Sequence, residues 1–179
     1  MKIGVVSDSH GHIENLRRAL RALLERGIQV FCHLGDDCED MRALEVGTLE
    51  VVQVPGVFSS YYRDPAVPNR VLRSWGGKRF LLTHTKVRHE NDLRGDPDPR
   101  ELVAKGEVDG ILYGHSHTPE VLAEQAVLFL NPGHLKDEDK KGYPPTYGLV
   151  EVKGEALSGM VYDLYSGEVL FSHTLGGAR

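Results

Sequence analysis

The sequence predicts an α/β fold in which two sheets pack face to face with helices outside, within one domain of residues 1–179. Three patterns favour this fold. Strand-like and helix-like segments alternate through the first half, a glycine pair joins two strand-like runs in the middle, and short strands fill the last third. A length of 179 residues with 40% hydrophobic residues suits one domain with a substantial core.

The first half of the chain indicates parallel strands. A β-rich run at Lys2–Val6 is followed by residues Ile13 to Arg26, whose apolar side chains recur at helical spacing until Gly27 ends the helix. The next expected elements are a strand at Ile28–Leu34, a short helix at Met41–Val46 and a strand at Leu49–Val54. Such alternation is typical of parallel strands joined by right-handed crossovers.

The second half contains a hairpin and a series of short strands. Gly76-Gly77 separates two β-rich runs and predicts a tight turn, after an irregular stretch from Pro55 to about Asn69. The expected elements are strands at Val71–Trp75 and Lys78–Leu82, a polar stretch from Thr85 to Asp98, a helix from Pro99 to about Lys105, and a strand at Asp109–Tyr113. We expect antiparallel strands at Val121–Glu124, Val127–Leu130, Tyr147–Val152, Leu157–Tyr162 and Val169–His173.

Composition excludes several classes of protein. The formal net charge of −5 argues against a nucleic-acid-binding protein, because that function needs a basic face. An acidic protein that acts on phosphate esters needs a local positive charge, and divalent cations are the strongest source. Cys32 and Cys38 fit two reduced thiols, and no apolar run approaches the length of a membrane span. Because a strand-like run begins at Lys2, we also expect no leader peptide. We therefore expect a cytoplasmic protein with no membrane partner.

Metal-binding side chains follow four of the expected strands. Because the carboxyl ends of strands in an open α/β sheet lie along one crevice, we expect two carboxylates and four imidazoles to converge there. Six ligands exceed what one cation needs and suit two, which indicates a two-metal hydrolase acting on phosphate esters. The six residues are Asp8, His10, Asp36, His84, His115 and His117.

The first two motifs have weak specificity when taken singly. Asp8 and His10 are spaced i, i+2, which places both side chains on the same side of an extended chain. An aspartate that caps the helix near Ile13, beside a surface histidine, explains the same residues. Asp36 can bridge two cations because a carboxylate has two oxygens, although Gly-Asp pairs are common in turns.

The two later motifs differ in strength. His84 alone, at the end of a strand, is more often a surface residue than a ligand. His115 and His117, spaced i, i+2 after a buried strand and surrounded by small residues, have few structural reasons to exist. Imidazole binds zinc, iron, manganese and nickel alike. This pair is therefore the most specific signal in the chain.

The ordered set of motifs D-x-H, G-D, H and G-H-x-H resembles that of the calcineurin-like metallophosphoesterase superfamily. The opening M-K-I-G-V-V-S-D-S-H-G, the run Y-G-H-S-H-T-P and Asn131-Pro132-Gly133 are similar to its small bacterial phosphodiesterase branch, and the likeness covers nearly the whole chain. It implies a four-layer α/β/β/α sandwich with a dinuclear site at the strand ends. It also implies that one metal is held by Asp8, His10, Asp36 and His117, and the second by Asp36, His84 and His115.

The chain departs from that family at one expected ligand. The family has Gly-Asn after the third strand, and the asparagine oxygen binds the second metal, but Val57 follows Gly56 here. Phe58-Ser59 also replaces the Cys-Asp that is usual in the small branch. We expect a weakened second site, since three protein ligands suffice for a catalytic cation. The residues that could substitute are Ser59, Ser60, Asp64 and His89.

Other polar residues near these motifs allow two readings each. Lys86 and Arg88 either hold a substrate phosphate or are ordinary loop charges. His12 fits the start of a helix better than a site. His134 follows Asn131-Pro132-Gly133, a turn that lies near the metals in the family that the sequence resembles.

The expected function is hydrolysis of a small phosphodiester or phosphomonoester by a hydroxide that bridges two divalent cations. Manganese is the expected metal, while nickel, zinc, iron and magnesium also fit the ligands, and the protein could form a homodimer. The alternative is a catalytically weak or inactive scaffold or binding protein on the same fold, which Val57 favours. Buried carboxylates are costly without a cation, which favours the enzyme. A nucleotide-binding protein is disfavoured, because the chain lacks Gly-x-Gly-x-x-Gly and a P-loop.

Overall fold

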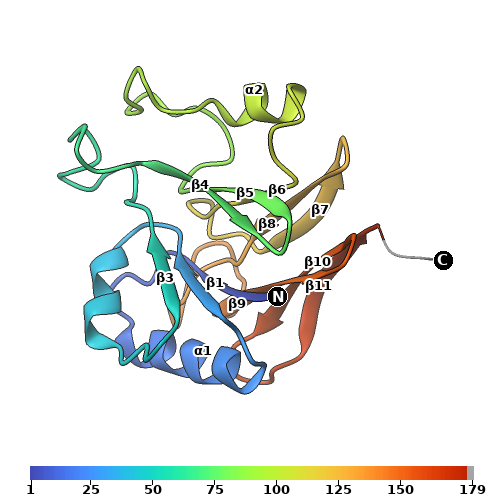
Figure 1. Cartoon of the computed structure of the whole chain (residues 1–179). Helices are drawn as coiled ribbons and strands as arrows, with labels where there is room; N and C mark the ends of the chain where they lie inside the picture. The colour runs from blue at the N-terminus through green and yellow to red at the C-terminus, as the bar shows by residue number, and fades with distance from the viewer. Residues whose placement is uncertain (177–179) are drawn as a thin grey trace.

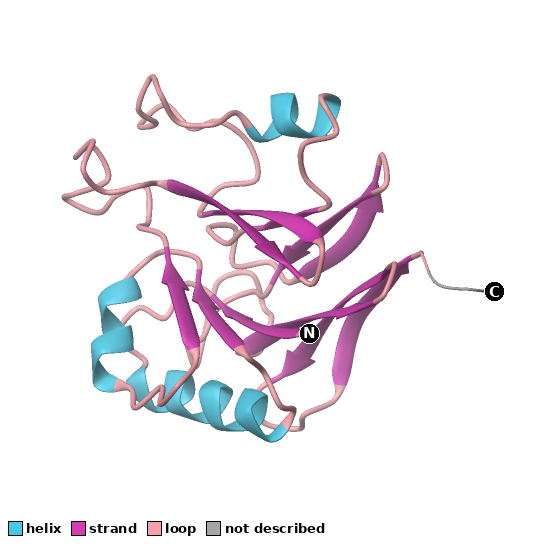
Figure 2. Cartoon of the chain, in the orientation of Figure 1, coloured by secondary structure: helices cyan, strands magenta, loops and turns pink. Residues whose placement is uncertain are grey.

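The computed structural model describes residues 1–176 and contains two sheets packed face to face (Figures 1 and 2). The first sheet has six strands in the order β11-β10-β9-β1-β2-β3. Their bounds are β1 Lys2–Val6, β2 Val30–His33, β3 Glu50–Gln53, β9 Thr146–Lys153, β10 Ala156–Asp163 and β11 Val169–Leu175. Strands β1, β2 and β3 are parallel, as the alternation predicted, whereas β9, β10 and β11 are antiparallel to their neighbours.

The second sheet has five strands in the order β4-β5-β6-β8-β7. Their bounds are β4 Arg70–Trp75, β5 Lys78–Thr83, β6 Gly110–Leu112, β7 Glu120–Glu124 and β8 Val127–Asn131. The expectation of antiparallel strands in the last third is confirmed for the pair β7 and β8 but was wrong for the other side of β8, which runs parallel to β6. A tight turn at Gln125 and Ala126 sends the chain back from β7, so β7 takes the sheet edge and β8 pairs with β6.

Helices cover the outer faces of both sheets. Helix α1 (Ile13–Glu25) lies against the first sheet, and helix α2 (Pro99–Ala104) lies over the second (Figure 1). The helix expected at Met41–Val46 is instead the 3-10 helix η1, Cys38–Ala43. Its buried side chains, Cys38 and Met41, are three residues apart, which is the spacing that a 3-10 helix places on one face.

Three apolar clusters confirm the α/β/β/α layers. The largest, which includes Val5, Leu82 and Val150, fills the space between the sheets. A second cluster lies under α1, where Leu16 and Leu23 meet the outer face of the first sheet. The third lies under α2. Burial on both faces explains why the central strands read as continuous apolar runs.

Two further predictions from the sequence concern the cysteines and membrane-spanning helices. Cys32 and Cys38 are both buried free thiols. Within residues 1–176, every helix is too short or too polar to cross a membrane.

Candidate metal centre

The six candidate ligands lie where four strands end at one rim of the sandwich. Asp8 and His10 follow β1, Asp36 follows β2, His84 follows β5, and His115 and His117 follow β6. Backbone hydrogen bonds tie these loops together in pairs: the Asp8 amide donates to the Gly35 carbonyl at 2.9 Å, and the Gly114 amide donates to the His84 carbonyl at 3.1 Å. The His115 amide donates to Asp8 Oδ2 at 3.0 Å and so joins the two sheets.

Five of these residues have a left-handed backbone conformation. This region is uncommon for non-glycine residues, although Asp and His tolerate it better than most. Such conformations cost of the order of 1–3 kcal/mol each and concentrate at functional sites. The φ angles are 52° for Asp8, 45° for His10, 47° for Asp36, 68° for His115 and 57° for His117.

Glycines let the backbone approach the candidate ligands closely. A Cβ atom on Gly56 would lie 1.8 Å from Asp36 Oδ1, and one on Gly35 would lie 2.3 Å from His84 Nδ1. Both distances are too short for any side chain. The packing of His84 therefore requires Gly35, and the packing of Asp36 requires Gly56, which the sequence pattern did not reveal.

The first ligand cluster consists of Asp8, His10, Asp36 and His117, with one ligand atom from each lying within 4.8 Å of all the others. His117 Nε2 is 3.3 Å from Asp8 Oδ1 and 3.2 Å from His10 Nε2. His10 Nε2 is 3.8 Å from Asp36 Oδ2. Two carboxylates and two imidazoles at these separations can surround one cation.

The second ligand cluster consists of Asp36, His84 and His115. His84 Nε2 lies 3.4 Å from Asp36 Oδ1 and 3.2 Å from His115 Nδ1. Asp36 therefore belongs to both clusters, since its Oδ1 faces His84 while its Oδ2 faces His10. This arrangement suits a carboxylate that bridges two cations.

Two of the histidines are held in the form that a metal needs. His84 Nδ1 lies 2.7 Å from the Leu34 carbonyl, and His117 Nδ1 lies 2.7 Å from Asp139 Oδ2. Because a carbonyl oxygen and a carboxylate only accept, each Nδ1 carries the hydrogen, and the lone pair of the neutral ring is on Nε2. Each Nε2 faces its ligand cluster.

The charges of this centre also fit a cation. Asp8 is fully buried, and its Oδ1 has no hydrogen-bond partner within residues 1–176. A buried carboxylate oxygen without a partner is costly in the absence of positive charge. In the metal-free protein the histidines supply part of that charge: contact with Asp8 raises the pKa of His117 to about 8, against the effect of burial and with a further contribution from Asp139.

Asp36 responds to the same field. Burial raises the pKa of its carboxyl group, but the contact with His84 and the charges of His84, His10 and His115 outweigh this and hold the pKa below its usual value. Asp36 is therefore kept ionised, which is the state that binds a metal.

Sequence reasoning missed two supporting carboxylates. Asp139, on the loop before β9, contacts His117 and also accepts from Lys136 Nζ at 2.9 Å. Asp40 Oδ2 accepts from Ser9 Oγ and from the Gly11 backbone amide, both at 2.8 Å, and so holds the loop that carries Asp8 and His10. Asp139 lies in a run of charged residues, 136–141, that is typical of an ordinary surface loop. No local pattern therefore distinguished it.

Val57 occupies a buried position with 2% of its surface exposed, and the Asn91 side-chain amide donates to its carbonyl at 3.0 Å. Of the four candidate substitutes for the missing ligand, His89 lies against the second cluster, with its ring centroid 5.9 Å from that of His115. Asp64 instead accepts from the Ala66 amide within its own turn.

The remaining polar residues have separate roles. Lys86 pairs with Glu120 at 3.0 Å and lies over the ring of Tyr113, so it is fixed in place. His12 marks the start of α1 and lies 3.5 Å from Asp137. His134 is buried beside His117, with 5.5 Å between ring centroids.

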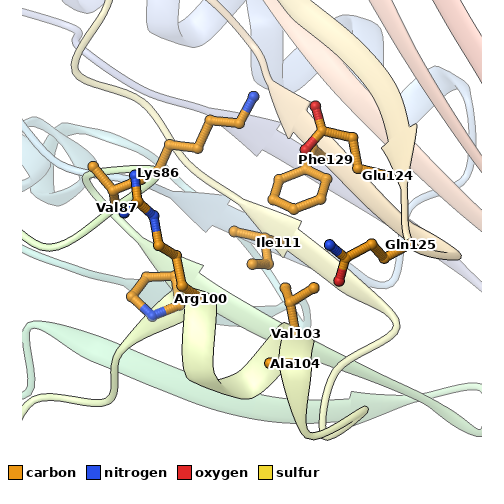
Figure 3. Close-up of a pocket in the computed structure, with 10 residues that line it drawn as sticks. Lys86, Val87, Arg100, Val103, Ala104, Ile111, Glu124, Gln125 and Phe129 are labelled. Atoms are coloured by element: carbon orange, nitrogen blue, oxygen red, sulfur yellow. The ribbon is translucent and has the colours of Figure 1, made fainter.

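Two cavities adjoin each other on the second sheet. A groove of about 450 Å³ begins at His115 and is bounded by Val87, Arg88 and His89. A cavity of about 440 Å³ lies beyond Lys86, where Figure 3 shows Ile111 and Phe129 facing Val103 of α2. The second cavity is lined by none of the six candidate ligands, whereas the groove is lined by His115.

The fold and this centre are of the metallophosphoesterase type. The chain matches the calcineurin-like phosphoesterase superfamily domain over residues 1–155 and belongs to that family. Among curated proteins it is similar to a phosphodiesterase of Methanocaldococcus jannaschii, with 23% identity over 86% of this chain and 94% of the relative. It is also similar to the phosphodiesterase YfcE of Escherichia coli, with 26% identity over 84% of this chain and 88% of the relative.

Solved structures support the same fold. A predicted phosphoesterase from Streptococcus pneumoniae superposes with a TM-score of 0.71 at 23% identity, covering 97% of this chain and 96% of that one. Vacuolar Protein Sorting 29 from Cryptosporidium parvum superposes with a TM-score of 0.70 at 23% identity, covering 98% of both chains.

Proposed function

We propose that this protein is a metal-dependent phosphodiesterase with two divalent cations at the rim of the sandwich. The observation that carries this proposal is the position of Asp36, whose two oxygens face two separate ligand clusters. One cation would be held by Asp8, His10, Asp36 and His117, and the other by Asp36, His84 and His115. Phosphodiesters are the favoured class because the two curated relatives reported above are named phosphodiesterases.

Bound cations would supply Lewis acidity and a water of lowered pKa, which phosphoester hydrolysis requires. The protein's own contribution is to place and orient the ligands. The Leu34 carbonyl holds His84, and Asp139 holds His117, each with Nε2 toward the centre. With Nε2 bound to a cation, these imidazoles would be unable to serve as the general base of a serine triad.

The alternative is a scaffold or binding protein on the same fold. Val57, which offers no ligand atom at the second cluster, favours this alternative. The six remaining candidate ligands argue against this alternative. Asp8 and Asp36 are largely buried among imidazoles, and this arrangement is costly without a cation. We therefore favour the enzyme.

The proposal is tested by loading the protein with manganese and measuring cleavage of bis(4-nitrophenyl) phosphate and 4-nitrophenyl phosphate. Parallel assays with nickel, zinc, iron and magnesium identify the preferred metal. Asp36→Asn should abolish turnover, because the amide loses the negative charge and one acceptor oxygen. Asp64→Asn, in a turn outside both clusters, is the matched control.

Absence of cleavage with every metal would support the scaffold instead. Turnover that survives in Asp36→Asn would show that the reaction does not use this centre.

A further inference from the structure

Phe58 is an exposed aromatic side chain at the edge of the metal centre. It has 73% of its surface exposed, the largest fraction among the exposed large apolar side chains of residues 1–176. Phe58 follows Val57 directly, so it lies in the loop where this chain departs from its family.

Phe58 forms an aromatic rim with His89 beside the candidate ligand His115. The Phe58 and His89 rings meet edge to face, with centroids 5.9 Å apart and an interplanar angle of 89°. His115 lies 6.2 Å from Phe58 and 5.9 Å from His89. The rim is therefore next to the place where a phosphate would bind, and the exposed surface of Phe58 is free to contact the rest of a substrate.

Hydrogen bonds hold the two halves of this rim together. The Asn91 side-chain amide donates to the Val57 carbonyl at 3.0 Å, and the Asn91 backbone amide donates to His89 Nδ1 at 3.1 Å. Asp92, which forms a buried ion pair with Arg70 at 2.8 Å, accepts from the His89 amide at 2.9 Å. A rim that is ordered before binding loses little entropy when a ligand arrives.

The groove beside the rim adds a positive charge. Arg88 and His89 both line it, together with His115. Lys86 is neutralised by Glu120, whereas Arg88 forms no ion pair within residues 1–176 and its Nη2 lies 3.4 Å from the Leu93 carbonyl. A volume of about 450 Å³ is within the usual range for small-ligand sites.

We propose that the rim of Phe58 and His89 binds the planar ring of a nucleotide-type substrate, a phosphodiester that carries a nucleoside next to the cleaved phosphate. A base can stack on the free face of Phe58, as aromatic side chains stack on bases without sequence preference. Arg88 would pair with phosphate oxygens in the groove. This inference rests on the proposed function, because the phosphate must lie at the metal centre.

The test uses two phosphodiesters with the same charge and the same 4-nitrophenol leaving group. One is the thymidine 5′-phosphate 4-nitrophenyl ester and the other is methyl 4-nitrophenyl phosphate. With manganese-loaded protein, kcat/KM should be higher for the thymidine ester. Phe58→Ala should reduce this preference by about tenfold, the loss of one stacked base. Leu72→Ala, an exposed apolar residue on β4 away from the centre, should leave the preference unchanged.

A binding measurement separates this inference from the proposed function. Calorimetric titration of the manganese-loaded protein should show tighter binding of thymidine 5′-monophosphate than of methyl phosphate, and Phe58→Ala should remove the difference. This result would support the rim even if neither ester were cleaved, which would refute the proposed function alone. Equal binding of the two phosphates by the wild type, or equal losses for both esters in Phe58→Ala, would overturn the inference.

Discussion

The Nδ1 atom of His117 lies 2.7 Å from Oδ2 of Asp139, although the two residues are 22 positions apart in the chain. The contact sets the tautomer of His117 and fixes its ring. Asp139 remains ionised: burial raises the pKa of its carboxyl group, but the hydrogen bonds from Lys136 and His117 lower the pKa well below its usual range. Asp139 therefore positions a candidate ligand and is not itself a member of either ligand cluster.

Asp139→Asn should weaken manganese binding by about tenfold, because outer carboxylates of this kind contribute about 10–100-fold to metal affinity. Calorimetric metal titration measures the change. Asp137→Asn is the control, since Asp137 contacts Asn15 and Tyr165 instead of the centre. Equal manganese affinity in Asp139→Asn and the wild type would show that His117 needs no such support.

Val57→Asn should strengthen the second metal site by restoring the asparagine that the family has at this position. We expect the variant to bind two manganese ions per chain at a lower metal concentration than the wild type, as measured by equilibrium dialysis with elemental analysis. Val57→Leu is the matched control, because leucine resembles asparagine in shape and offers no ligand atom. Identical metal affinity in all three proteins would mean that the valine does not weaken the site.

Arg70→Met should lower the free energy of unfolding by about 3–5 kcal/mol, the usual effect of removing one partner from a buried ion pair. Arg70 and Asp92 have side chains that are 0% and 1% exposed, and Arg70 also donates to the Pro97 carbonyl at 2.8 Å. The substitution should also loosen the loop that carries His89. Urea denaturation measures the change, with Arg73→Met, an exposed neighbour on β4, as a nearly neutral control. A loss as small as that of Arg73→Met would contradict the assigned role.

His33 should make the folded protein sensitive to mild acid. Burial lowers the pKa of its imidazole to about 4, from an unfolded value of 6.5. The unfolded chain therefore binds a proton first as the pH falls, so His33 contributes full stability above pH 6.5 and loses it between pH 6.5 and about 4. The lost contribution is about 3 kcal/mol.

Urea denaturation of metal-free protein between pH 7 and pH 4 tests this expectation. His33→Gln keeps a polar group near Ser9, which lies 3.0 Å from His33 Nε2, but cannot be protonated. Its unfolding free energy should fall less steeply with acid than that of the wild type. Parallel curves for the two proteins would assign the acid sensitivity to other groups.

Much of the fold was predictable because its signals are local. The apolar run of β1, the helical spacing in α1 and the glycine pair between β4 and β5 each depend on neighbouring residues. The place of β8 in the sheet could not be predicted, because its pairing with β6 depends on where β7 lies. The bounds of η1 also differ from the predicted helix, because packing determines the bounds of short helices more than propensity does.

The sequence by itself determined the kinds of ligand and their positions at strand ends: Asp8 and His10, Asp36, His84, and the pair His115 and His117. Strand ends can be read from apolar runs, and parallel strands bring their carboxyl ends to one edge. Only the tertiary structure decided which oxygen of Asp36 faces each cluster, that Asp139 and Asp40 support the centre, and that Phe58 and His89 meet beside His115. These relationships join loops that are far apart in the chain. Such contacts arise from how the two sheets pack, and no local pattern encodes them.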